Sequence, residues 1–191
     1  MAKKYEFKPD KPRSGVLSKL HLTRQQRLRI LKWLLYSLLL VALSVLQDVI
    51  LCRFKFLGAT TDLVPCGILL ICVLEGMHDS CIFALIAACL YQLSGGPGYY
   101  CIALIVVLGI FAAYFRQSFL QQSFSAVLLC LTVALLLYEG SVFLAGFITA
   151  STTLSRLSLP LLTTLLTLLL CPLLYPLIRG ISSIGGEIWK E

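Results

Sequence analysis

Apolar residues fill most of the chain in six runs, which short polar or glycine-rich breaks separate. About 20 apolar residues in an α-helix rise about 30 Å, the thickness of the hydrocarbon core of a membrane. The pattern therefore predicts six transmembrane helices. We place them, to within about three residues, at 33–51, 63–77, 80–94, 99–116, 123–149 and 155–179.

The second and third runs are short for a core of that thickness. The polar residues Glu75, His78 and Asp79 lie between them, so a single helix over 63–94 would place charges in its middle. We expect a tight helical hairpin with a polar tip, and neighbouring helices and a thinned bilayer would accommodate the shortfall in length.

The last run contains two prolines, Pro172 and Pro176. Proline has no N–H and clashes with the carbonyl one turn earlier, so we expect the helix to kink or end there. The hydroxyls of Thr163, Thr164 and Thr167 could bond the carbonyls that the prolines leave without a donor.

The composition indicates that lipid is the main solvent of this chain. Hydrophobic residues make up 59% of its 191 residues and charged residues 13%, and the mean hydropathy is +0.91. A soluble fold of this size could not bury so much apolar surface. This excludes a soluble enzyme, a nucleic-acid-binding domain and a secreted disulfide scaffold, and it predicts an all-α integral membrane protein.

The charge is concentrated at the start of the chain. Residues 1–32 hold ten Lys or Arg against Glu6 and Asp10, which is a net charge of +8. The rest of the chain carries a net charge of −1, so the whole chain carries +7. The positive-inside rule places this arm in the cytoplasm. Six spans then place the tail 180–191 there too, with 33–179 as the membrane domain. We expect the arm to contact anionic lipid.

The eight cysteines do not form a disulfide framework in this pattern. Most lie within apolar runs, and there is no C-x-x-C pair. We interpret them as small apolar residues. The alternative is a bridge between Cys52 and Cys101, which lie near span ends.

Small residues recur at a spacing of four, which places each pair on one helix face and allows close helix packing. Such faces could pack within the bundle or dock a partner membrane protein. The pairs are Ala84 and Ala88, Gly109 and Ala113, and Ser141 and Ala145.

Glu139 lies near the midpoint of the fifth run, where a charge costs about 2.5–3.5 kcal/mol on insertion scales. No Lys or Arg lies mid-span to pair with it. We expect a neutral or hydrogen-bonded side chain that faces the bundle interior. It could clamp helices together or contact a partner's helix, or it could relay protons or bind a ligand. Asp62 precedes the second run, where an acidic cap favours a helix start.

Signatures of catalysis are missing from the sequence. There is no phosphate-binding G-x-x-x-x-G-K-[ST], no H-E-x-x-H and no G-x-S-x-G. The group Glu75, His78 and Asp79 has no nucleophile or metal ligand beside it, so we interpret it as a solvated hairpin tip. We predict no catalytic, cofactor-binding or metal-binding residue.

The stretch from Leu46 to Ala113 resembles the rod shape-determining protein MreD family. Four features carry the resemblance: a first span that ends in Leu46-Gln47, an Asp/Pro-containing start of the second span at 61–65, a second span that ends at Gly76, and the glycine-rich turn at 95–100 before an apolar fourth span. In the third span, alanines stand where that family often has glycines.

The resemblance implies a non-enzymatic scaffold of the bacterial cell-elongation machinery in the cytoplasmic membrane. It implies binding to MreC and, through that complex, a link from MreB filaments to RodA and a class B transpeptidase. No nucleic acid and no small-molecule substrate are expected. The residues that we expect to face a partner are Gln47, Asp62, Gly76, Ala84, Ala88, Gly109 and Ala113.

The predicted six-helix bundle is also similar to the substrate-binding subunits of energy-coupling-factor vitamin transporters. A vitamin-binding subunit is therefore the alternative function. It would need an outward-facing polar pocket. The side chains that could form this pocket are Tyr91, Gln92, Tyr99, Tyr100 and Glu139.

Overall fold

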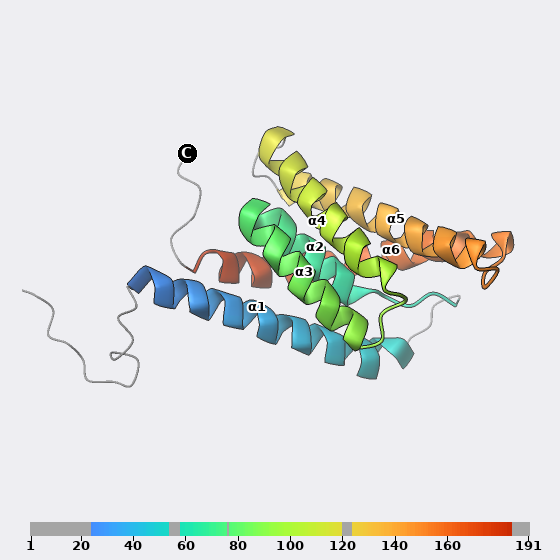
Figure 1. The fold of residues 1–191 in the computed structure, drawn as a ribbon, viewed down its shortest axis with the longest axis horizontal. Coiled ribbons are helices and arrows are strands. Elements are labelled where there is room, and N and C mark those ends of the chain that lie inside the picture. The colour runs from blue at the N-terminus through green and yellow to red at the C-terminus, as the bar shows by residue number, and fades with distance from the viewer. Residues whose placement is uncertain (1–23, 54–57, 76, 120–123, 185–191) are drawn as a thin grey trace, which may run out of the picture.

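The computed structural model describes residues 24–53, 58–75, 77–119 and 124–184, and this part of the chain contains no β-strand. Gly76, the arm up to residue 23 and the end of the tail lie outside it. Six α-helices form one bundle (Figure 1). They are α1 (Arg24–Val49), α2 (Leu63–Leu74), α3 (Met77–Leu93), α4 (Tyr100–Phe119), α5 (Phe124–Ile148) and α6 (Ser158–Ser182). Single 3-10 turns, η2 (Leu51–Arg53) and η3 (Leu154–Arg156), follow α1 and precede α6.

Each predicted apolar run coincides with one of these helices. Three segments are long and apolar enough to cross a membrane: Gln26–Arg53, Phe124–Ile148 and Leu154–Ser182. The apolar helices of the other three runs are shorter: Leu63–Leu74, Met77–Leu93 and Tyr100–Arg116. Large apolar side chains cover the outside of the bundle, and Leu169 of α6, for example, is 74% exposed. Such a surface is suited to lipid, so the chain is a membrane protein.

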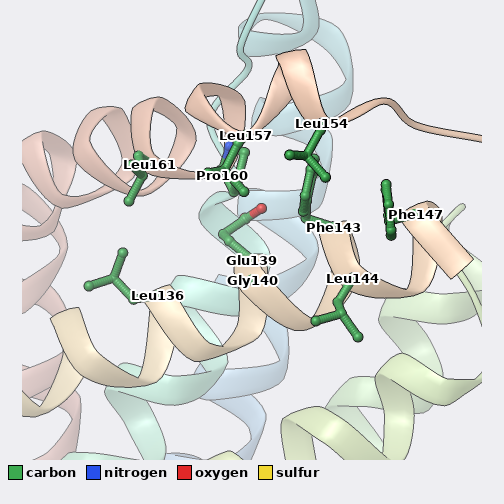
Figure 2. Close-up of a pocket in the computed structure, with 10 residues that line it drawn as sticks. All are labelled: Leu136, Glu139, Gly140, Phe143, Leu144, Phe147, Leu154, Leu157, Pro160 and Leu161. Carbon is green, nitrogen blue, oxygen red and sulfur yellow. The ribbon is translucent and has the colours of Figure 1, made fainter.

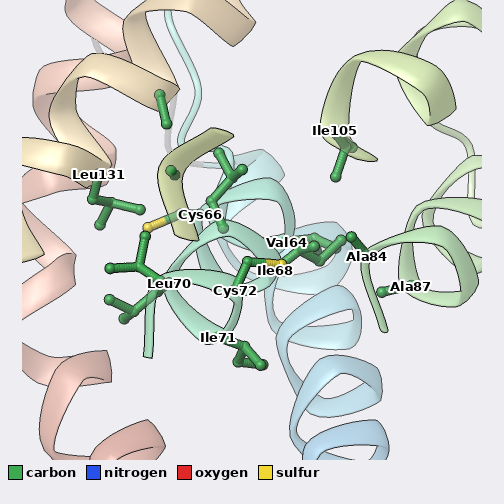
Figure 3. Close-up of a cluster of buried hydrophobic side chains, with 14 of the residues drawn as sticks. Val64, Cys66, Ile68, Leu70, Ile71, Cys72, Ala84, Ala87, Ile105 and Leu131 are labelled. Carbon is green, nitrogen blue, oxygen red and sulfur yellow. The ribbon is translucent and has the colours of Figure 1, made fainter. Parts of the chain in front are cut away.

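The short helix α2 lies at the centre of the bundle. All twelve of its residues are buried, and it packs against each of the other five helices. Figure 3 shows its side chains directed toward Ala84 of α3, Ile105 of α4 and Leu131 of α5. Glycine allows the closest approach, because a Cβ on Gly67 would lie 2.8 Å from a methyl group of Leu43 on α1.

The prediction for the prolines of the last run is wrong in part. α6 continues through Pro172 and Pro176 to Ser182. The threonine hydroxyls do not bond the carbonyls one turn before these prolines. Instead, Thr164 donates to Pro160 O and Thr167 donates to Thr163 O, which lie earlier in the helix. Tertiary packing of the apolar face of α6 outweighs the local preference to break it.

All eight cysteines are unpaired thiols. Cys52 is exposed whereas Cys101 is buried, so the alternative of a bridge between them is wrong. Five cysteines are buried, all of them in the core of the bundle beside leucine and isoleucine, which confirms their interpretation as small apolar residues there.

Candidate functional site

Charged side chains meet at the carboxyl end of α2. The ammonium group of Lys32 donates to Glu75 Oε2 at 2.7 Å, and the Tyr36 hydroxyl donates to Glu75 Oε1 at 2.5 Å. Both side chains of the ion pair are nearly buried, with 11% and 6% of their areas exposed for Lys32 and Glu75. The Tyr36 hydroxyl also lies near the side chain of Ser182, at the end of α6. The prediction of a solvated tip at Glu75 is therefore wrong: this carboxylate joins α1 to α2.

The last carbonyls of α2 receive further donors. The Arg116 guanidinium of α4 donates to Val73 O, and the Ser80 hydroxyl of α3 donates to Cys72 O at 2.9 Å. Arg116 is half-buried in this arrangement. A cation at a helix carboxyl end also stabilises the helix dipole. α3 and α4 are thus fixed to the same end of α2 as α1.

The amino end of α2 is capped by α1. The side-chain oxygen of Gln47 accepts a hydrogen bond from Val64 N at 2.9 Å, and its amide nitrogen donates to Asp62 Oδ1 at 3.3 Å. Asp62 stands at the N-cap position but makes no side-chain capping bond. The prediction that Asp62 caps this helix is therefore wrong, because Gln47 from another helix supplies the acceptor.

Asp62 also connects α2 to α5 and α6. Its backbone N–H donates to the hydroxyl of Thr167 at 3.1 Å, and its carboxyl group faces that of Glu139. Burial raises the pKa of Asp62. Two ionised carboxylates would repel each other here, and a proton between them turns the contact into a hydrogen bond. The Tyr138 hydroxyl is buried nearby, beside the side chain of Tyr91.

A groove of about 500 Å³ opens between α5 and the η3–α6 segment, and Glu139 lines it (Figure 2). Figure 2 shows the carboxyl oxygen of Glu139 directed into the space between the two segments. The side chain is buried, with 9% of its area exposed. Every other residue that lines the groove is apolar or glycine. The expectation that Glu139 is hydrogen-bonded toward the interior agrees with its contact to Asp62.

The structure brings together two of the residues that we expected to face a partner, Gln47 and Asp62. It places the small-residue pairs of α3 and α4 inside the bundle. A Cβ on Gly109 would lie 3.1 Å from Cys72 Sγ, and Ala84, Ala88 and Ala113 are buried. These four residues are buried among other residues of the described chain. Gly76 lies outside the described residues.

In the described part of the chain, the five side chains proposed for a vitamin pocket do not all lie together. Tyr99 is 83% exposed, and the Gln92 amide donates to Gly96 O within its own turn at 3.2 Å. Tyr91 packs against the core on the side of Asp62 and Glu139. Tyr100 is exposed.

Sequence reasoning missed Lys32, Tyr36 and Thr167 as parts of these clusters. Lys32 was counted only as one charge of the basic arm. A signal was present, because Lys32 and Tyr36 are four residues apart and therefore lie on one face of α1. Nothing in the sequence could have paired this face with Glu75, 39 residues beyond Tyr36.

Comparison of the chain with known protein families, with curated proteins and with solved structures finds no match.

Proposed function

We propose that the chain crosses the bacterial cytoplasmic membrane six times, with both termini in the cytoplasm. The two ends of α2 support this topology, because each is bonded to a different end of the apolar part of α1: Glu75 to Lys32, and Val64 to Gln47. From Lys32 to Gln47, α1 rises about 22 Å, and α2 covers about 16 Å of the same depth in the opposite direction.

The shortness of α2 is compatible with a crossing because protein surrounds it. Polar backbone groups are costly where they face lipid, but they are tolerated at membrane depth inside a protein. Gln47 meets the amino end of α2, and Ser80 and Arg116 meet its carboxyl end. A thinned bilayer is therefore not required for this helix.

We further infer that the chain is a non-enzymatic membrane scaffold of the bacterial cell-elongation machinery, as the resemblance to MreD implies. In this role it binds MreC and thereby links MreB filaments to RodA and the class B transpeptidase. The observation that carries the inference is the use of the buried polar groups. Lys32, Glu75, Gln47 and Asp62 join helices to one another, and the groove at Glu139 is lined by apolar residues. Such a molecule is suited to holding other membrane proteins.

Co-purification tests this function directly. The affinity-tagged full chain is expressed in its native host at its normal level and purified from membranes in mild detergent. We expect MreC to be retained with it, and we expect rod-shaped cells to become round when the chain is depleted. Saturable, tight binding of a vitamin to the purified chain, with no MreC retained, would overturn the scaffold in favour of the vitamin-binding subunit.

A further inference from the structure

One face of α5 lines the groove, where no other residue of the described part of the chain covers it. The α5 residues that line the groove recur at intervals of three and four, which places them in one stripe along the helix. They are Leu136, Glu139, Gly140, Phe143, Leu144 and Phe147. Such a stripe is the pattern with which a helix packs against another helix.

Gly140 marks the place where a neighbour could come closest. A Cβ built on this residue meets no atom within 4 Å, although it stands in the middle of a helix that is otherwise packed on both sides of the stripe. A small residue at an uncovered helix face lets a second helix backbone approach closely in a membrane. The space beside Gly140 is therefore of the right kind for a helix.

Glu139 determines which chemical group a molecule that binds in the groove must carry. Its carboxyl is nine-tenths buried and directed into the groove, and it is the one polar side chain among the residues that line it. The basic side chains Lys32 and Arg116 are engaged at the opposite end of α2. A carboxyl group has two oxygens, so Glu139 can keep its contact with Asp62 while an occupant that brings a hydrogen-bond donor to this depth gains a partner that apolar lipid tails do not use.

The depth of Glu139 in the membrane indicates that this hydrogen-bond donor comes from a helix rather than from a lipid. Glu139 lies nine residues before the end of α5 at Ile148, which corresponds to about 13 Å along the helix axis. The polar groups of a lipid stay at the interface, whereas a transmembrane helix can carry a polar side chain at any depth.

We propose that the groove between α5 and α6 is the docking site for a single transmembrane helix of a partner, which lays its backbone over Gly140 and directs a hydrogen-bond-donating side chain to Glu139. The inference rests on the proposed scaffold function and assigns its binding site. The small-residue faces of α3 and α4 then serve the internal packing of the bundle, and the partner occupies the opposite flank.

The test uses the full chain co-expressed with tagged MreC and purified from membranes. Gly140→Leu adds a bulky side chain at the groove, at a position where a Cβ meets no atom within 4 Å. Gly180→Leu is the matched control, because Gly180 is also an exposed helical glycine with open space around it, at the far end of α6. We expect at least a tenfold loss of MreC with Gly140→Leu, no loss with Gly180→Leu, and unchanged melting temperatures or higher ones for both. Glu139→Gln, which keeps an acceptor, should retain MreC, and Glu139→Leu should not.

A photo-crosslinking amino acid at Leu144, which is 60% exposed in the groove, identifies the occupant, and one at Leu173, 70% exposed on α6 outside it, is the control. We expect a crosslink from position 144 to the membrane span of MreC and none from position 173. If MreC co-purifies with the wild-type chain and equally with the Gly140→Leu variant, or if position 144 crosslinks to lipid alone, the docking site is wrong and the scaffold function stands. If MreC does not co-purify with the wild-type chain, both the docking site and the scaffold function are wrong.

Discussion

The ion pair between Lys32 and Glu75 makes a quantitative prediction, because the two side chains and Tyr36 form a closed group at one end of the bundle. Breaking a buried ion pair by removal of one partner costs about 3–5 kcal/mol of unfolding free energy, since the other charge stays buried without compensation. We therefore expect Lys32→Met and Glu75→Leu each to lower the free energy of unfolding by about 3 kcal/mol or more.

Removing the hydroxyl alone should cost less. Tyr36→Phe deletes one hydrogen bond to a charged acceptor, which is worth about 1.5–3 kcal/mol, and leaves the ion pair in place. The triple variant removes the two charges and the hydroxyl together, and replacing a whole buried ionic group with apolar residues is often neutral or stabilising. We expect the triple variant to lie within about 1 kcal/mol of the wild type, although the single effects sum to several times that.

The chain contains its own probe for this measurement. Trp33 packs against the rings of Tyr36 and Phe83, with centroids 6.0 and 5.4 Å apart. In a Trp189→Phe background, its fluorescence during reversible unfolding by sodium dodecyl sulfate in mixed micelles reports the state of this end of the bundle. A triple variant as unstable as Glu75→Leu would refute the reasoning, as would a Lys32→Met variant within about 0.5 kcal/mol of the wild type.

Three further predictions concern the rest of the bundle, each read out by thermal or denaturant unfolding of the purified protein. Gln47→Leu leaves the buried Val64 N–H without an acceptor and should cost about 1–3 kcal/mol; an unchanged stability would contradict interhelical capping. Gly109→Leu should cost more than 1 kcal/mol through overpacking against α2, whereas Gly140→Leu, where space is open, should not destabilise. Burial raises the pKa of Asp62, so the folded state should lose stability as the pH rises from its unfolded pKa of about 4 through the raised pKa; Asp62→Asn should weaken that dependence, and an identical pH profile would count against it.

The helices themselves were largely predictable from the sequence. Long apolar runs and the breaks between them define six helices, and the glycine-rich turn after α3 uses Gly95 at φ +107, a conformation that glycine adopts without strain. The shortness of the apolar run that forms α2 also indicated that this helix is too short to cross the full thickness of a membrane core. The solution, a helix surrounded by protein, could not be predicted because it depends on which helix lies in the centre.

The polar clusters were less predictable because their partners are far apart in sequence. Thr167 and Asp62 are separated by 105 residues, and Gln47 and Val64 by 17. Periodicity within one helix places a residue on a face but does not choose the helix that faces it. The same reason explains why the small residues of α3 and α4 could equally have faced a partner: only the packing shows that they are buried in the bundle.

Site-specific labelling from the two sides of the membrane tests the six-crossing topology most directly. Cysteine replaces Ser94, Ser151, His78 and Ser183 in turn in the full chain, in a background that lacks the three exposed native cysteines (Cys52→Ser, Cys81→Ser and Cys89→Ser). Intact cells stripped of their outer layers are then treated with a membrane-impermeant maleimide. The account predicts labelling of positions 94 and 151 in intact cells, and of positions 78 and 183 only after the membrane is opened. Labelling of positions 94 and 151 from opposite sides would contradict it.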